Sequence, residues 1–142
     1  MKTLVIYFSH TGKTRGLAEE KAKEEGADLL EIRTKKPYSF FSSYLKGAPL
    51  AKVQGEDEIE PINCDFSAYD KIILAAPIWN GFPAPAFNSL TKLLPAKTKV
   101  ELIFTAGGGN TRDKGKIRQK LEDQGLEVLD MTVTRVKRKK RS

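Results

Sequence analysis

The sequence predicts a three-layer α/β sandwich around a five-stranded parallel sheet in the order 2-1-3-4-5. Strand-like runs alternate with helical segments along the 142-residue chain, as in successive βαβ units. The runs that begin near Leu4, Ile72 and Val100 are almost wholly apolar, which is typical of central strands buried on both faces. Those near Leu30 and Leu129 alternate with polar residues and suit the two edges. Right-handed crossovers then give this order.

The first elements are a strand, a polar loop and a helix. An apolar run at Leu4–Phe8 leads into the loop, and helix-forming residues continue from Leu17 to Glu25, with Gly26 as a natural stop. This arrangement directs backbone N–H groups and the positive end of the helix dipole toward one point. The sequence therefore predicts an anion site at residues 9–14. An ordinary capped turn is the alternative.

An irregular stretch follows the second expected strand at Asp28–Arg33. It runs from Thr34 to Phe66 and contains an apolar i, i+3, i+4 pattern at Phe41, Tyr44 and Leu45, which indicates a short helix. A full crossover helix normally stands here. The stretch is therefore either a functional loop or lid, or a degenerate crossover whose aromatic residues fill the core.

The second half of the chain continues the alternation. The expected elements are a strand at Lys71–Ala76, a helix at Pro85–Leu94, a strand at Lys99–Thr105, a helix at Thr111–Gln124 and a last strand at Glu127–Val136. The loops after the first, third and fourth strands would meet at the carboxyl edge of the sheet, where open α/β sheets bind ligands.

The positive charge of the chain belongs to its end. The formal net charge is +7, but six of the 25 Lys and Arg residues lie at positions 135–142, which leaves 19 against 18 acidic residues. We therefore expect one domain at residues 1–136 and a disordered basic tail at residues 137–142. The single cysteine, Cys64, fits a reducing cytoplasm. No apolar run approaches the roughly 20 residues of a membrane span.

Three kinds of phosphate chemistry could use the loop at residues 9–14. A nucleoside-triphosphate loop needs a glycine where Tyr7 stands. A tyrosine phosphatase needs a cysteine nucleophile where Ser9 stands, with five residues between it and Arg15. The third kind, non-catalytic binding of a phosphomonoester, remains. A receiver domain would share the sheet order, but it needs acidic residues at Ser9-His10 and an aspartate at Ala76-Pro77, and the sequence therefore excludes it.

Several stretches, in the same order along the chain, resemble the short flavodoxins. They are Leu4–Ser9, the loop Ser9–Thr14, Gly26–Ile32, Tyr69-Asp70, Pro77-Ile78-Trp79 and the glycine-rich loop after the fourth strand. The resemblance covers the chain from Lys2 to about Val136. It implies a noncovalently bound FMN at the carboxyl edge of the sheet.

The resemblance also implies which residues hold FMN. The phosphate would lie on the loop formed by Ser9, His10, Thr11, Gly12, Lys13 and Thr14, with His10 contributing its backbone rather than acid–base chemistry. Trp79 would stack on the flavin ring. Backbone near the ring would come from Pro77, Ile78, Asn80 and Gly81, and at its pyrimidine edge from Gly107, Gly108, Gly109 and Asn110. No catalytic residue and no metal ligand is predicted.

Three functions are compatible with these features. The resemblance implies a cytoplasmic electron carrier that acts with a redox partner protein. The resemblance implies that an electron carrier is acidic and often has a tyrosine in its last loop. Here the body is near neutral and residues 106–113 contain no aromatic residue. These two differences leave open an FMN-dependent NAD(P)H oxidoreductase for a small quinone-like acceptor. A binding module that acts on anions through the basic tail is the third hypothesis. The sequence indicates no specific nucleic-acid site and no oligomeric state.

Overall fold

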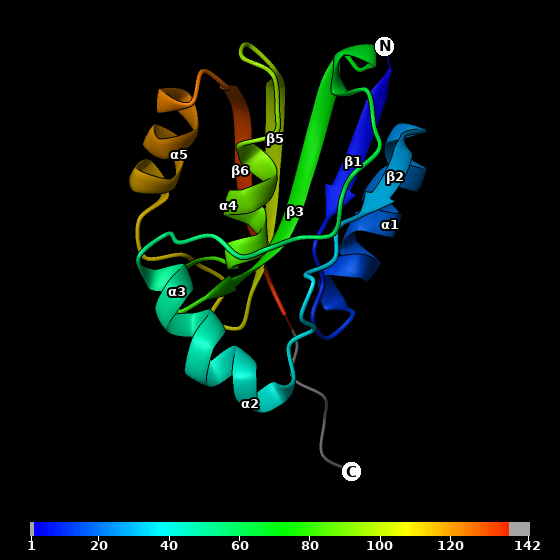
Figure 1. The fold of residues 1–142 in the computed structure, drawn as a ribbon. Helices are drawn as coiled ribbons and strands as arrows, with labels where there is room; N and C mark the ends of the chain where they lie inside the picture. Colours follow the sequence, from blue (N-terminus) through cyan, green and yellow to red (C-terminus); the bar gives the residue numbers. More distant parts are fainter. Residues whose placement is uncertain (1, 137–142) are drawn as a thin grey trace.

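A parallel sheet forms the centre of the computed structural model, which describes residues 2–136, so the expectations for the tail lie outside the described residues. Its order is β2-β1-β3-β5-β6, with all four neighbouring pairs parallel (Figure 1). This confirms the predicted order 2-1-3-4-5. The parallel strands are β1 (Thr3–Tyr7), β2 (Asp28–Glu31), β3 (Lys71–Trp79), β5 (Lys99–Ala106) and β6 (Glu127–Arg135).

Helices connect these strands; the first begins at Lys13, four residues before the predicted Leu17, and the last begins at Lys114, three residues after the predicted Thr111. They are α1 (Lys13–Glu25), α2 (Phe40–Ser42), the π-helix η1 (Ser43–Gly47), α3 (Ala48–Lys52), the 3-10 turn η2 (Phe66–Ala68), α4 (Pro85–Thr91) and α5 (Lys114–Asp123). Gly26 ends α1 in the left-handed conformation, with φ of 63°, because a residue without Cβ adopts it at little cost.

The two faces of the sheet are covered differently. Helices α4 and α5 bury one face, where Phe87 and Ile117 pack with Leu4 and Ile6 of β1. On the other face α1 presents small residues, Ala18 and Ala22, to Val5 and Ile73. Because β1 is covered on both sides, all five of its residues are buried, as its unbroken apolar run predicts.

Ion pairs extend the cover on the face of α1. The ammonium group of Lys71 lies 3.2 Å from Glu25 and 3.4 Å from Glu101, and that of Lys21 lies 3.4 Å from Glu101. These side chains join α1 to β3 and β5. They cover the part of this sheet face that lies beside α1, because the described part of the chain supplies no second helix there (Figure 1).

Strand β3 is longer than its sequence predicts. It continues through Pro77 and Ile78 to Trp79, then turns back as the short antiparallel strand β4 (Phe82–Pro83). The prediction that this strand ends at Ala76 and is followed directly by a loop is therefore wrong. Pairing with β4 supplies partners for the added residues, and Pro77 still lies beside Thr105 of β5.

The irregular stretch at residues 34–66 forms an outer layer near the carboxyl end of β3 (Figure 1). Its helical part, residues 40–52, confirms the expected short helix. Phe41 and Tyr44 are exposed, so the explanation that these aromatic residues fill the core is wrong; Tyr38 instead packs against the core edge. Among the described residues, no helix has the length and apolar character needed to cross a membrane.

Candidate functional site

The carboxyl ends of β1, β3 and β5 surround a hollow of about 200 Å³. Three segments that are far apart in sequence supply its walls, as the doubly wound topology predicts. The lining residues are His10, Thr11, Lys13, Thr14, Pro77, Ile78, Trp79, Thr105, Ala106, Gly107 and Val136. The structure therefore brings together eight of the residues that the sequence singled out, and adds Thr105, Ala106 and Val136.

The loop at residues 9–14 is shaped by its own hydrogen bonds. Gly12 has a φ of 94° and caps α1, and its N–H donates to the Ser9 hydroxyl at 3.0 Å. The Thr14 hydroxyl is buried and hydrogen-bonds that of Thr105 at 2.7 Å, which ties α1 to β5. Thr11 and Lys13 are exposed at the hollow. Ser9 and Thr14 thus shape the loop, whereas the exposed side chains of Thr11 and Lys13 line the hollow.

Trp79 lies at the end of β3 rather than in a loop. Its ring makes edge-to-face contacts with Tyr38, His10 and Phe8, at centroid distances of 5.1, 5.7 and 5.9 Å. Gly47 lies against the same indole so closely that a Cβ there would come within 2.6 Å of it. The His10 ring therefore serves to pack Trp79, and the stretch at residues 34–66 supports the indole through Tyr38 and Gly47.

The turn between β3 and β4 consists of Asn80 and Gly81, with φ of 50° and 91°. Positive φ at both central residues is typical of a type I′ hairpin turn, for which Asn-Gly is a preferred sequence. Arg112 holds this turn: its N–H donates to the Gly81 carbonyl at 2.9 Å, and its guanidinium to Asn80 Oδ1 at 3.1 Å. The turn borders the hollow without lining it.

The glycine-rich loop after β5 is only partly in the hollow. Gly107 lines it, whereas Gly108, Gly109 and Asn110 do not. No atom lies within 4 Å of the position that a Cβ would take at Gly107 or Gly108. This side of the site is therefore open, and residues 107–110 contribute less to the hollow than the sequence predicts.

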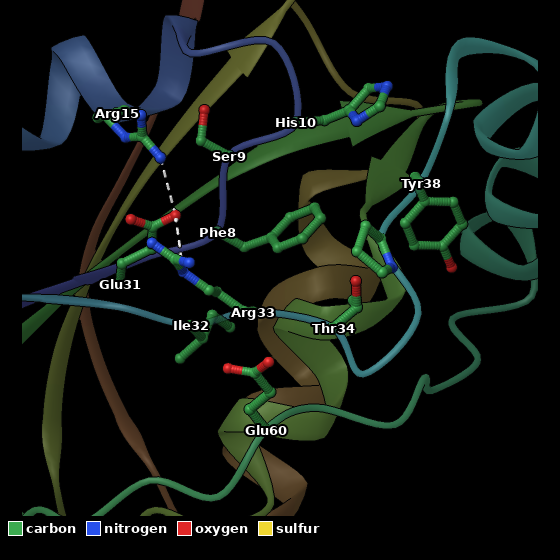
Figure 2. Close-up of a pocket in the computed structure, with 11 residues that line it drawn as sticks. Phe8, Ser9, His10, Arg15, Glu31, Ile32, Arg33, Thr34, Tyr38 and Glu60 are labelled. Carbon is green, nitrogen blue, oxygen red and sulfur yellow. Dashed lines mark hydrogen bonds and ion pairs between the residues drawn. The ribbon is translucent and has the colours of Figure 1, made fainter.

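A second hollow, of about 340 Å³, lies on the β2 side of the same loop (Figure 2). Its wall carries an ion-pair cluster in which Arg15 and Arg33 approach Glu31 at 2.9 and 3.6 Å and the Tyr7 hydroxyl donates to Glu31 at 3.0 Å. Burial raises the pKa of Glu31, but the hydrogen bonds from Arg15 and Tyr7 outweigh it and leave that pKa below its ordinary value. Glu60 also lines this hollow, which makes it a poor anion site.

No cluster of three or more His, Cys, Asp or Glu side chains in residues 2–136 is arranged to hold a metal ion. Cys64 is partly buried, and burial raises the pKa of its thiol, which opposes a reactive thiolate.

Comparison with known proteins identifies the family of this chain. The family model described as Flavodoxin matches residues 2–133. The chain belongs to the flavodoxin family. A Lactobacillus acidophilus flavoprotein, whose crystal structure is a complex with FMN, is 27% identical to this flavodoxin, with a TM-score of 0.78 over 94% of this chain and 93% of that one. A search of curated proteins gives no significant match.

Two further solved structures share the fold of this flavodoxin at lower identity. A candidate flavoprotein of Bacteroides eggerthii is 22% identical, with a TM-score of 0.80 over 93% of this chain and 87% of that one. Two-electron reduced flavodoxin of Megasphaera elsdenii is also 22% identical, with a TM-score of 0.53 over 92% of this chain and 84% of that one.

Sequence reasoning missed several residues around the site of this flavodoxin. Tyr38, Gly47 and Arg112 support Trp79 or the turn after it. Asn80 and Arg112 are 32 residues apart, and no local pattern relates them. The one available signal was that residues 34–66 stand where a crossover helix is expected. This signal indicated that the stretch has a function, but it did not indicate which of its residues contact the site.

Proposed function

We propose that this chain is a cytoplasmic FMN-binding flavodoxin that carries electrons between redox partner proteins. The observation that carries the proposal is the hollow in which the loop at residues 9–14, the end of β3 and Gly107 converge. It occurs in a chain that matches the flavodoxin family over residues 2–133.

The residues of the hollow fit a phosphate at one end. Lys13 lines it, no Asp or Glu does, and the first turn of α1 begins there. N–H groups of a first helical turn have no partner within the helix and attract anions. Thr11 and Lys13 would hold the phosphate together with the backbone at Gly12, while Ser9 and Thr14 keep the loop in shape.

The other end of the hollow fits a planar ring. Trp79, Ile78 and Ala106 give it apolar walls, and the space beside Gly107 is open. Bound FMN supplies a ring that accepts and donates electrons. The chain would present the Trp79 indole to this ring, held in place by its aromatic neighbours. Arg112 would hold the Asn80–Gly81 turn so that its backbone groups stay directed toward the ring.

Ligand titration tests the proposal. Protein freed of flavin should bind FMN much more tightly than riboflavin, and ATP weakly. Thr11→Val should weaken FMN binding but leave riboflavin binding nearly unchanged, because it removes a hydroxyl at the phosphate end. Thr132→Val, an exposed position on β6, is the matched control. Equal affinity for FMN and riboflavin would refute the phosphate assignment.

Two observations favour a second candidate, an FMN-dependent NAD(P)H oxidoreductase for small quinone-like acceptors. Gly107 and Gly108 have no atom near the position of a Cβ, and residues 106–113 include no aromatic side chain. The ring face opposite Trp79 would thus be accessible to a planar acceptor. Steady-state oxidation of NAD(P)H with a quinone separates the two functions, since a pure carrier does not sustain it.

A further inference from the structure

Three tyrosine hydroxyl groups in residues 2–136 donate a hydrogen bond to a carboxylate. The pairs are Tyr7–Glu31, Tyr38–Asp57 and Tyr69–Asp28. Tyr7 packs on the α1 face of the sheet, whereas Trp79 packs against the cluster on the other face. Tyr69 pairs with the first residue of β2, at the opposite end of the sheet from Trp79, which is the last residue of β3. Of the three pairs, Tyr38–Asp57 is the one whose ring contacts Trp79.

The Tyr38 ring joins Trp79 to the carboxylate of Asp57. Its centroid lies 5.1 Å from that of the indole, at an interplanar angle of 78°, and its hydroxyl donates to Asp57 Oδ2. Figure 2 shows this hydroxyl directed away from His10. Edge-to-face rings at this separation are in direct contact, so an electron can pass between Tyr38 and Trp79 without an intervening group.

The Asp57 carboxylate is held in place from several sides. The Asp57 N–H donates to the Ser89 hydroxyl at 2.9 Å, and that hydroxyl donates to the Asp57 carbonyl. Asp57 Oδ1 accepts from the Glu58 N–H at 2.8 Å and lies 3.7 Å from the Lys46 ammonium group. The side chain is 12% exposed, so water competes little for Oδ2. Burial and the hydrogen bond to Asp57 raise the pKa of Tyr38, and the phenol therefore keeps its proton on the side of Asp57.

We propose that Tyr38 and Asp57 form a relay that removes an oxidising equivalent from Trp79. A small oxidising radical in the hollow takes one electron from the indole and becomes an anion. Tyr38 then gives one electron to the indole and its phenolic proton to Asp57, which leaves neutral Trp79, a neutral phenoxyl radical and a protonated carboxyl group. A phenol that loses an electron becomes a strong acid, so a carboxylate already in hydrogen-bond contact lets the electron and the proton leave together. A thiolate from solution finally reduces the phenoxyl radical, and Asp57 returns the proton.

The relay leads from one hollow to the other. Trp79 lines the hollow of about 200 Å³ at the carboxyl ends of β1, β3 and β5. Tyr38 lines the second hollow, of about 340 Å³, where a small reductant can reach it from solution. Transfer between the two rings does not require flavin, whereas an origin of the oxidant at a bound flavin rests on the proposed function.

Tyr44 is a second tyrosine near Trp79. It lines a hollow of about 220 Å³ together with Trp79 and Asn80. Tyr44 is 75% exposed, however, and no carboxylate in residues 2–136 accepts a hydrogen bond from its hydroxyl. Its oxidation would have to release the proton to water, so the structure favours Tyr38.

Pulse radiolysis of the full-length protein, with FMN and without it, tests the relay. Azidyl radicals oxidise indole in preference to phenol near neutral pH and are reduced to azide, and Trp79 is the only tryptophan. The absorption of the tryptophanyl radical should decay as that of a tyrosyl radical rises, at one rate that does not depend on protein concentration. Tyr38→Phe should remove the tyrosyl signal and prolong the tryptophanyl radical. Asp57→Asn should slow the transfer on the order of tenfold, because a hydrogen bond to a charged acceptor is exchanged for one to a neutral acceptor.

The pair at the other end of the sheet supplies matched controls. Tyr69→Phe and Asp28→Asn remove the same chemical groups there and should leave the rate as in the parent. Circular dichroism and the Trp79 emission spectrum of each variant separate loss of the relay from loss of the fold. A parent in which no tyrosyl radical forms would overturn the proposal. A tyrosyl radical that survives Tyr38→Phe would assign the step to another tyrosine, and a rate unchanged by Asp57→Asn would exclude Asp57 as the proton acceptor; both outcomes overturn it.

Discussion

The loop–helix unit at residues 9–26 and the stretch at residues 34–66 border the same aromatic cluster, but they are held in place by different means. In the first, neighbours in sequence decide the structure: the Gly12 N–H donates to Ser9, and Gly26 ends α1. In the second, partners are distant. Tyr38 donates to Asp57, and the Asp57 N–H donates to the Ser89 hydroxyl of α4 at 2.9 Å.

Two glycines show what this difference means for the site. Gly12 has a φ of 94°, and no atom lies within 4 Å of the position that its Cβ would take, so this glycine is needed for its backbone conformation. Gly47 has an ordinary helical φ of −66°, yet a Cβ there would lie 2.6 Å from Trp79 and 3.1 Å from Tyr38. Gly47 is needed for the space it leaves. The local unit is thus constrained by conformation and the long-range stretch by packing.

The largest effect is expected for Gly47→Ala. The added methyl group must displace the Trp79 or Tyr38 ring, and overpacking of this kind costs about 1–3 kcal/mol. The free energy of unfolding in urea should fall accordingly. Because Trp79 is the only tryptophan, its emission spectrum reports on the displacement directly. An unchanged emission maximum would contradict the close packing of Gly47 on the indole.

Gly12→Ala should have a smaller effect of a different kind. A residue with Cβ in a left-handed conformation costs about 1–2 kcal/mol, but the methyl group meets no neighbour. Urea denaturation should show this loss while the Trp79 emission spectrum stays as in the parent. An emission shift as large as that of Gly47→Ala would remove the distinction between the two regions.

The same difference explains what the sequence could predict. β1, α1 and its stop at Gly26 follow from an apolar run, helix formers and a glycine, all of them local signals. The support of Trp79 by Tyr38 and Gly47 depends on tertiary packing across more than 30 residues, and the extension of β3 depends on pairing with β4. The convergence of the carboxyl ends of β1, β3 and β5 was predictable because topology alone requires it. The orientation of each side chain was not.

Gly16→Ala should change stability least among the glycine substitutions, and in the opposite direction. Gly16 lies within α1 at an ordinary φ, and no atom lies within 4 Å of the position that its Cβ would take. Alanine then stabilises the helix by about 0.4–1 kcal/mol, because it restricts the unfolded chain and favours helix. Thermal unfolding measures the gain, and a loss of stability would contradict the open space around this position of α1.

The last and smallest effect concerns Glu31, which lies where the two regions meet. It accepts hydrogen bonds from Arg15 of α1 and Tyr7 of β1, and these outweigh the effect of burial and lower its pKa from the ordinary 4.5. A carboxyl group whose pKa is lower in the folded state stabilises the fold above its unfolded pKa, and this contribution is lost as the pH falls through the folded pKa. The parent should therefore have a higher free energy of unfolding than Glu31→Gln, and this difference should be greatest near neutral pH and shrink below about pH 4.5.

Urea denaturation as a function of pH measures this difference between the parent and Glu31→Gln. Glu20→Gln, an exposed position on α1, is the control and should follow the parent. Solvent and salt screen the partly exposed Arg15, so the difference should also decrease at high salt. Parallel pH profiles for the parent and Glu31→Gln would mean that the cluster orders the Arg15 side chain without stabilising the junction between the two regions.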